Sequence, residues 1–472
     1  MNGLGRMVSG AVCALTLAAT PLLSQQPAQP PSKLPPPAQD QAPGAGAQVH
    51  TGTSSGLDSN ARLRNLLADH QFPRIEAQLN QLPPAQAQFY RGILANRSND
   101  AKTSIELLEP LADQVSSGGD KAAEKLLRKA LAEDYLRLGD WAKAAAAYQL
   151  LGTRLEDQLT ADERDEIEMP VKLLPLAKAN PPMTAEPCEP FVLQVSKNPL
   201  GLIDIPVFVD ARPHSWMLDP TSPFNLIARS LAREAGLKVS EESATIQTLT
   251  GRPMQVHTAV VPRFTIGGRL TLRNMTVFVF EDADYTFPLS GYQVQGVLGY
   301  PALAALGSLT ITADATIAVE PASQPTDLAS PTGPVSANLP GARFFLDGDQ
   351  IVVALGKEGD ERMYAIDAGS QQTYLTSRYY AEHMDDFSGR RRQLFTMPGM
   401  ISMPAQPAYV ADAVALEVGL RTAYVHFVQV LTQPLGQSAL DDVYGVIGID
   451  ALDQLKSYTF DYRTMRFSVT PE

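Results

Sequence analysis

The chain has 472 residues, of which 44% are hydrophobic and 19% are charged. This length is too great for one core and predicts about three compact units. The formal net charge of −13 argues against nucleic acid or an anionic membrane surface as the main partner. Arg390 to Arg392 form a basic cluster, which we interpret as a solvated loop rather than a binding patch.

Residues 1–24 have the pattern of a signal peptide. Arg6 supplies a positive charge, and a short apolar stretch from Val8 to Leu23 follows it. The stretch falls short of the ~20 residues that a membrane-spanning helix needs, so we favour cleavage near Ser24 over an uncleaved anchor. We therefore expect an exported protein, periplasmic or secreted, with no membrane span after signal removal.

Two segments have the composition of flexible connections. Residues 25–56 are dominated by Pro, Gln, Ala and Gly, and residues 322–341 by Pro, Ser and Ala. Such segments bury too little apolar surface to offset the entropy of ordering them. We expect a disordered tether and a linker, respectively. If Cys13 leaves with the signal, Cys188 is the one remaining cysteine and no intrachain disulfide can form.

Residues 57–180 are predicted to form a helical domain. Leu127, Leu131, Tyr135 and Leu138 follow the spacing of one helix face. The segment 130–141 resembles a tetratricopeptide repeat, and a weaker match lies around residues 89–108. The offset between the two exceeds the usual repeat length, so an insertion near residues 116–119 must be assumed. We expect a protein partner for this helical domain; the alternative is a plain array of helical hairpins with no partner.

From Phe191 onward the chain changes to short β-type runs that are separated by Gly and Pro. Two aspartates in this part, Asp219 and Asp367, each end an apolar run just where the chain turns. Similar landmarks follow both aspartates at nearly equal spacing: Gly251 and Gly399 in turn-like segments, then Gly299 and Gly448 after two apolar residues. The shared spacing predicts an internal duplication.

This pattern resembles the retropepsin-like aspartic peptidases, particularly exported bacterial members, from about Phe191 to the end of the chain. The resemblance implies two β-barrel lobes, residues 190–321 and 342–472, made from one duplicated unit. It also implies one role for each landmark: Asp219 and Asp367 as the catalytic pair, Gly251 and Gly399 at the flap tips, and Gly299 and Gly448 supporting the catalytic loops. No metal or cofactor is implied.

A pair of aspartates suits peptide hydrolysis for a direct physical reason. Two carboxylates about 3 Å apart cannot both ionise, so they share one proton. The ionised partner accepts a proton from an attacking water, while the protonated one donates to the scissile carbonyl oxygen. The two groups titrate as a unit.

Both aspartate motifs depart from the family pattern. The residue after each aspartate normally carries a hydroxyl, but Pro220 and Ala368 stand there. Thr221 replaces a glycine, and we expect its Cβ to strain the turn. The residues that match, and that we expect to support the pair, are Ser222, Gly369 and Ser370. The serine hydroxyls are expected to bond the outer carboxylate oxygens.

Other candidate groups are weaker. His214, His257, His383 and His426 lack metal-ligand spacing, so no metal site is predicted. We expect Trp216 in a core, and we name three tyrosines as candidates for the border of a cleft: Tyr285, Tyr292 and Tyr300.

The sequence therefore predicts a multidomain α plus all-β protein, with a helical-hairpin repeat domain followed by two retropepsin-like acid-protease β-barrel lobes. Its predicted function is that of a single-chain aspartic-type endopeptidase that cleaves a peptide or protein held between the lobes. The first alternative is an inactive pseudopeptidase whose cleft binds peptide while the helical domain recruits a partner. A structural envelope protein is the second alternative.

Overall fold

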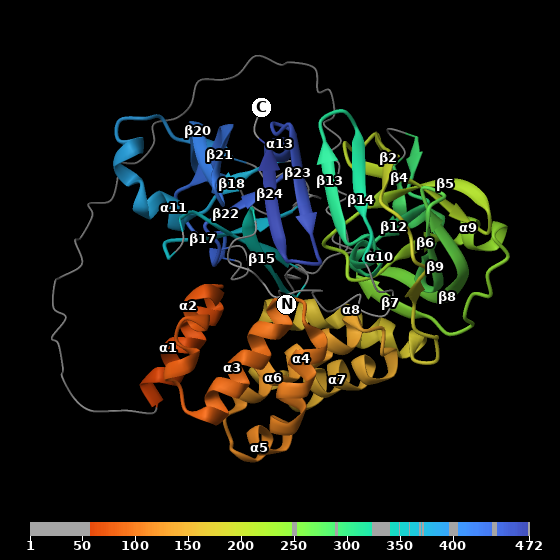
Figure 1. The fold of residues 1–472 in the computed structure, drawn as a ribbon, viewed down its shortest axis with the longest axis horizontal. Helices are drawn as coiled ribbons and strands as arrows, with labels where there is room; N and C mark the ends of the chain where they lie inside the picture. Colours follow the sequence, from red (N-terminus) through yellow and green to blue (C-terminus); the bar gives the residue numbers. More distant parts are fainter. Residues whose placement is uncertain are drawn as a thin grey trace, which may run out of the picture.

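The computed structural model describes residues 57–247, 253–287, 291–322, 340–348, 350–357, 359–367, 370, 372–395, 405–436 and 441–470. The expected signal peptide, the tether and most of the linker lie outside these residues. Helices form the N-terminal part and β-sheets the C-terminal part, so the protein has an α plus β fold (Figure 1). No helix in the described ranges is long and apolar enough to cross a membrane.

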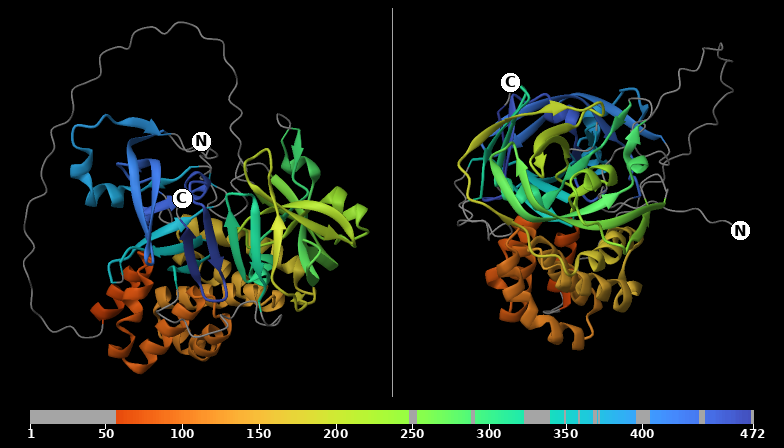
Figure 2. Two further views of the ribbon diagram at one scale, coloured as in Figure 1. Left: turned by 45° about the horizontal axis from the view of Figure 1, so that its top comes forward. Right: turned by 90° about the vertical axis from the view of Figure 1, so that its right-hand side faces the viewer.

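The helical region, residues 57–177, packs as a series of neighbouring helices on one side of the β part (Figure 2). Its α-helices are α1 Leu57–Ala68, α2 Phe72–Glu76, α3 Pro84–Arg97, α4 Ala101–Leu108, α5 Ala112–Ser117, α6 Lys121–Arg137, α7 Trp141–Arg154 and α8 Ala161–Ala177. Short 3-10 turns lie at Leu79–Gln81, Glu109–Leu111 and Glu156–Gln158.

Side chains at the helix starts explain several of these boundaries. Asp100, Asp120 and Asp140 each accept a hydrogen bond from the backbone N–H three residues later. Thr160 forms a reciprocal capping box with Glu163 at the start of α8. Such caps satisfy N–H groups that the helix itself leaves without a partner. Residues 138–140 separate α6 from α7.

The first β segment runs from residue 184 to residue 320. Its strands are β1 Thr184–Ala185, β2 Phe191–Gln194, β3 Ser196–Lys197, β4 Ile203–Val209, β5 Arg212–Leu218, β6 Leu226–Ala228, β7 Ala244–Gln247, β8 Pro253–Ile266, β9 Leu270–Phe280, β10 Thr286–Phe287, β11 Tyr292–Gln293, β12 Gly296–Leu298, β13 Ser308–Thr312 and β14 Thr316–Glu320. Its helices are α9 Arg229–Glu234, the 3-10 turn Asp282–Tyr285, and α10 Tyr300–Leu306. Trp216 is fully buried in its core, as predicted.

The second β segment runs from residue 342 to residue 470. Its strands are β15 Ala342–Asp347, β16 Gln350–Leu355, β17 Arg362–Ile366, β18 Tyr374–Leu375, β19 Gln393–Phe395, β20 Gln406–Val418, β21 Arg421–Leu431, β22 Gly445–Ile447, β23 Ser457–Asp461 and β24 Arg466–Thr470. Its helices are α11 Ser377–Glu382, the 3-10 turn Met384–Phe387, and α13 Ile449–Leu452.

Strand pairing follows a similar order in the two β segments. In the first, β5 pairs in parallel with β12, and β12 pairs antiparallel with β6. In the second, β17 pairs in parallel with β22, and β22 pairs antiparallel with β18. A long hairpin, β8–β9 or β20–β21, lies beside each of these groups. Strands β13 and β23 pair with each other and join the two segments in one sheet.

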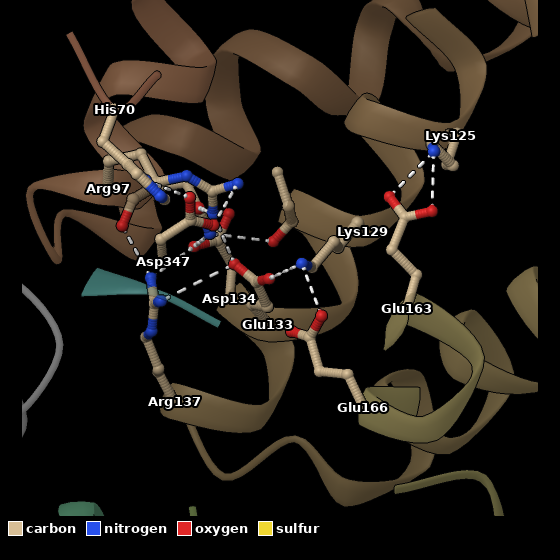
Figure 3. Close-up of polar contacts among 12 residues, drawn as sticks. His70, Arg97, Lys125, Lys129, Glu133, Asp134, Arg137, Glu163, Glu166 and Asp347 are labelled. Atoms are coloured by element: carbon tan, nitrogen blue, oxygen red, sulfur yellow. Dashed lines mark hydrogen bonds and ion pairs between the residues drawn. The ribbon is translucent and has the colours of Figure 1, made fainter. Parts of the chain in front are cut away.

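A buried cluster of charged side chains connects the helical region to the second β segment (Figure 3). Asp347, at the end of β15, lies 2.9 Å from Arg97 Nη2 and 3.0 Å from His70 Nδ1. Burial opposes the ionisation of Asp347, but Arg97 and His70 outweigh it and hold the pKa of this carboxyl well below its usual range. The cluster continues through the helices by way of Glu133, Asp134, Arg137, Lys129 and Glu166.

The stability of the helical region should depend on pH because of Asp134, a buried residue in the last turn of α6. Burial raises its pKa to about 7, because Arg137 offsets only part of the lost hydration. Protonated Asp134 therefore contributes favourably to the free energy of unfolding. This contribution is complete below the ordinary aspartate pKa near 4 and is lost as pH rises through 7. Between pH 5 and pH 8 we expect this group to remove about 2–4 kcal/mol from the free energy of unfolding.

Urea unfolding of the full chain, followed by helical circular dichroism, measures this effect. Asp134→Asn should flatten the decline between pH 5 and pH 8. The matched control is Asp113→Asn, which changes an exposed aspartate on α5 and should keep the wild-type slope. Equal slopes for wild type and Asp134→Asn would contradict the prediction.

Candidate functional site

Asp219 and Asp367 occupy equivalent places in the two β segments. Asp219 follows β5, and its N–H donates to Leu298 O at the end of β12, at 3.0 Å. Asp367 follows β17, and its N–H donates to Ile447 O at the end of β22, also at 3.0 Å. In both cases a parallel neighbour strand fixes the backbone of the aspartate just as the chain begins to turn.

The loop after Asp219 donates two hydrogen bonds to the carboxylate of this residue. Thr221 donates to Asp219 Oδ1 twice, from its backbone N–H at 3.0 Å and from its hydroxyl at 2.7 Å. Asp219 is only 3% exposed. The expected strain at Thr221 is wrong, because its φ is not among the positive values found in the described residues. A threonine therefore fits this turn and adds a second donor to the carboxylate.

The loop after Asp367 holds its aspartate with a backbone donor. Ser370 N donates to Asp367 Oδ1 and to the Asp367 carbonyl, at 3.1 Å in each case. Asp367 is less buried than Asp219. Ala368 and Gly369 lie outside the described residues.

The expected hydroxyl contacts of the two serines are wrong. Ser222 Oγ donates to Phe224 O at 2.8 Å, and Ser370 Oγ donates to Gln372 O at 3.0 Å. Each hydroxyl has one proton, so it closes a turn of its own loop instead of bonding the carboxylate. Both serines therefore shape the loops and do not touch the aspartate oxygens through their hydroxyls.

Gly299 and Gly448 lie directly against these two loops. A Cβ on Gly299 would come within 2.2 Å of Phe224 O and 2.6 Å of Ser222 O. A Cβ on Gly448 would come within 2.8 Å of Gln372 O and 2.9 Å of Ser370 O. The two glycines therefore allow the strand ends to approach the loop backbones. Gly251 and Gly399 lie outside the described residues.

Two further residues contribute to this arrangement and were not singled out from the sequence. Asn225 Oδ1 accepts the N–H of Gly299 at 3.1 Å, and Thr373 Oγ1 accepts the N–H of Gly448 at 2.9 Å. Asn225 and Thr373 each stand six positions after their aspartate, so the repeat spacing contained a signal for them. Thr373 also donates to Asp450 Oδ1 at 2.6 Å.

Of the three candidate tyrosines, Tyr300 lies at the Asp219 loop. Its N–H donates to Ser222 O at 2.8 Å, and its ring lies 6.0 Å from that of Tyr462, a residue of the second β segment. Burial, with smaller contributions from Tyr300 and the charge of Asp219, raises the pKa of Tyr462 well above its usual range. Asp219 therefore lies within electrostatic reach of the second segment.

The other two tyrosines have different surroundings. Tyr292 contacts the carboxylate of Asp204 at 3.1 Å, and Tyr285 is buried with its ring 4.6 Å from that of Phe280. Across the described ranges, no three His, Cys, Asp or Glu side chains are grouped so that they could hold a metal ion.

Comparison with known proteins gives a family match for part of the chain. Residues 205–302, which include Asp219 and Gly299, match the family model described as aspartyl protease. No curated protein matched the chain. The family match supports an aspartic protease family for the segment that contains the Asp219 loop.

Similar solved structures include two basic 7S globulins and one protease. Basic 7S globulin from soybean is 12% identical over 60% of this chain and 95% of its own, with a TM-score of 0.35. Conglutin gamma from lupine seeds is 11% identical over 61% and 96%, with a TM-score of 0.36. A retropepsin-like aspartic protease from Rickettsia conorii is 17% identical over 28% and 99%, with a TM-score of 0.21.

Proposed function

We propose that this chain is an exported aspartic-type endopeptidase whose catalytic pair is Asp219 and Asp367. The observation that carries the proposal is the equivalence of the two loops. Each aspartate follows a strand that pairs in parallel with a second strand, and a glycine comes directly after that second strand. The N–H of each aspartate donates to the last carbonyl oxygen of the second strand at 3.0 Å. We infer two lobes from one duplicated unit, with Gly251 and Gly399 at their flap tips.

In the proposed reaction the two carboxylates share one proton and act on a water molecule between them. The ionised carboxylate accepts a proton from this water as it attacks the peptide carbonyl. The protonated carboxyl donates to the carbonyl oxygen, which carries the developing negative charge. The donors from Thr221 and Ser370 hold the carboxylates in orientation while this happens.

A pseudopeptidase is the second candidate function. It is favoured by the burial of Asp219, which is 3% exposed, and by the loss of both hydroxyls next to the aspartates, at Pro220 and Ala368. In this alternative the cleft binds peptide without cleaving it, and a tetratricopeptide-like helical region recruits a protein partner.

One assay separates the two functions. The protein is incubated with a diverse peptide pool from pH 3 to pH 8, and new termini are identified by mass spectrometry. The double variant Asp219→Asn with Asp367→Asn is the control. The endopeptidase proposal expects cleavage by wild type and none by the variant. Absence of cleavage by wild type, or cleavage that survives in the variant, rejects the proposed pair.

Thr221→Val tests the second donor to Asp219. Valine keeps the branched shape but removes the hydroxyl that lies 2.7 Å from Asp219 Oδ1. A hydrogen bond to a charged group contributes about 1.5–3 kcal/mol, so we expect cleavage to fall roughly 10- to 100-fold. Steady-state kinetics measure kcat and KM separately, and the loss should appear in kcat. Thr221→Ser keeps the hydroxyl and should retain most of the rate; equal losses in both variants would contradict the assigned role.

A further inference from the structure

The loop after Asp219 is covered by helices α6 and α8. Between them lies a cavity of about 60 Å³, lined from the helices by Leu136, Arg137 and Met169 and from the loop by Pro220, Thr221 and Pro223. Pockets that hold ligands usually exceed roughly 300 Å³. The space between the helices and this loop is therefore too small for a peptide segment.

The helical region also contacts both β segments, so it spans the junction between them. On the first segment, the hydroxyl of Tyr300 donates to Asn99 Oδ1 after α3. Helix α8 packs against β7 and β8, which pair with each other in antiparallel fashion. On the second segment, the ring of Phe345 lies 4.8 Å from that of Phe72 on α2.

Asp347 forms a buried charged contact between the helical region and the β part (Figure 3). Two other ion pairs between these parts, Arg343 with Glu76 and Arg378 with Asp69, are more exposed. Asp347 inserts between Arg97 and His70, and it is the only one of the labelled residues in this figure that comes from a β-strand. Its neighbour Gly348 lies against Glu166 of α8, where a Cβ would come within 2.2 Å of Oε1. Removal of the charge of Asp347 leaves Arg97 buried with less compensation.

We propose that the helical region is an intramolecular cover that keeps peptide from Asp219, and that it must separate at the Asp347 and Tyr300 contacts before the site is open. This inference rests on the proposed function, because it assumes that a peptide substrate must reach Asp219. The surface of the helices that faces the Asp219 loop shields this loop from peptide and solvent. Tyr300 connects the Asp219 loop directly to the helical region. Its backbone N–H donates to Ser222 O in the loop, and its hydroxyl donates to Asn99 Oδ1 in the helical region.

Hydrogen exchange measured by mass spectrometry on the full chain tests the cover. Asp347→Asn and Tyr300→Phe each weaken one contact from the β side without replacing any residue of the helical region. We expect exchange of the amides in residues 219–226 to increase about tenfold in either variant, while residues 121–154 of α6 and α7 stay protected. Asp412→Asn is the matched control, since Asp412 is an exposed residue of β20 that pairs with Arg390, and it should leave the loop unchanged.

The exchange result does not depend on catalysis, so it separates failure of the cover from failure of the proposed function. Unchanged exchange at residues 219–226 in both variants overturns the cover. A rise of equal size throughout the helices overturns it as well, because it indicates general loosening instead of separation. If wild type cleaves peptides, the two variants should cleave them several-fold faster, and slower cleavage would show that the helices support the site instead of covering it.

Discussion

Replacement of either Asp219 or Asp367 by Asn should lower peptide cleavage by at least ~10³-fold and leave the fold unchanged. Asparagine has the shape of aspartate but cannot share a proton, so each single variant removes the function of the whole pair. The two losses should therefore be similar, and the double variant should lose little more than either single one. Cleavage of one substrate found in the peptide pool, measured at the optimal pH, gives the three rates.

Asp314→Asn is the control for these variants, because Asp314 is an exposed turn residue between β13 and β14. It should cleave at the wild-type rate. Near-ultraviolet circular dichroism should show the same tertiary packing in all the variants. A single variant that keeps more than a tenth of the rate would contradict a shared proton, and so would losses that multiply in the double variant.

The positions of the two aspartate loops could be predicted from the sequence because local patterns determine them. An apolar run that ends in Asp219, and another that ends at Gly299, become two parallel neighbours, β5 and β12. The second segment repeats this with Asp367 and Gly448. The spacing shared between the halves made Gly299 and Gly448 equivalent positions, and the resemblance to retropepsin-like peptidases implied that both glycines support the loops.

Contacts that depend on side-chain rotamers could not be predicted in the same way. The hydroxyl of Ser222 bonds Phe224 O, and the sequence could not show that it would bond this carbonyl instead of the carboxylate of Asp219. The family glycine at the position of Thr221 predicts strain for a threonine, but Thr221 is not among the described residues with positive φ. Asn225 and Thr373 share a six-residue spacing from their aspartates, but their role depends on the glycine N–H that each accepts, which only the folded structure shows.

Contacts between the helical and β parts had no signal in the sequence. Asp347 is the last residue of an ordinary strand, β15. Nothing near it in the sequence indicates that Arg97 and His70, more than 200 positions earlier, contact its carboxylate. Composition and periodicity predict structure within about one helix or hairpin. The contact of Asp347 with Arg97 and His70 depends instead on how two folded regions pack against each other. The tetratricopeptide resemblance and the export signal remain predictions.

Gly299→Ala is expected to be among the most destabilising single substitutions in the β part. The φ of Gly299 is −90°, which alanine adopts easily, so backbone conformation is not the problem. The added Cβ would lie 2.2 Å from the carbonyl oxygen of Phe224 and 2.6 Å from that of Ser222, and both are backbone atoms that cannot rotate away. We expect a loss of about 3 kcal/mol in the free energy of unfolding, at the upper end of the cost of overpacking.

Gly448→Ala should have a smaller effect of the same kind, because its Cβ would lie 2.8 Å from the nearest atoms. We expect a loss of ~1–2 kcal/mol for this variant. Gly152→Ala is the matched control: on helix α7 its Cβ would meet Val171 at an ordinary 3.5 Å, and alanine in a helix should stabilise by ~0.5–1 kcal/mol. Thermal and urea unfolding of the three variants give the ranking. If Gly299→Ala unfolds at the wild-type midpoint, the Asp219 loop is not held against β12 as described.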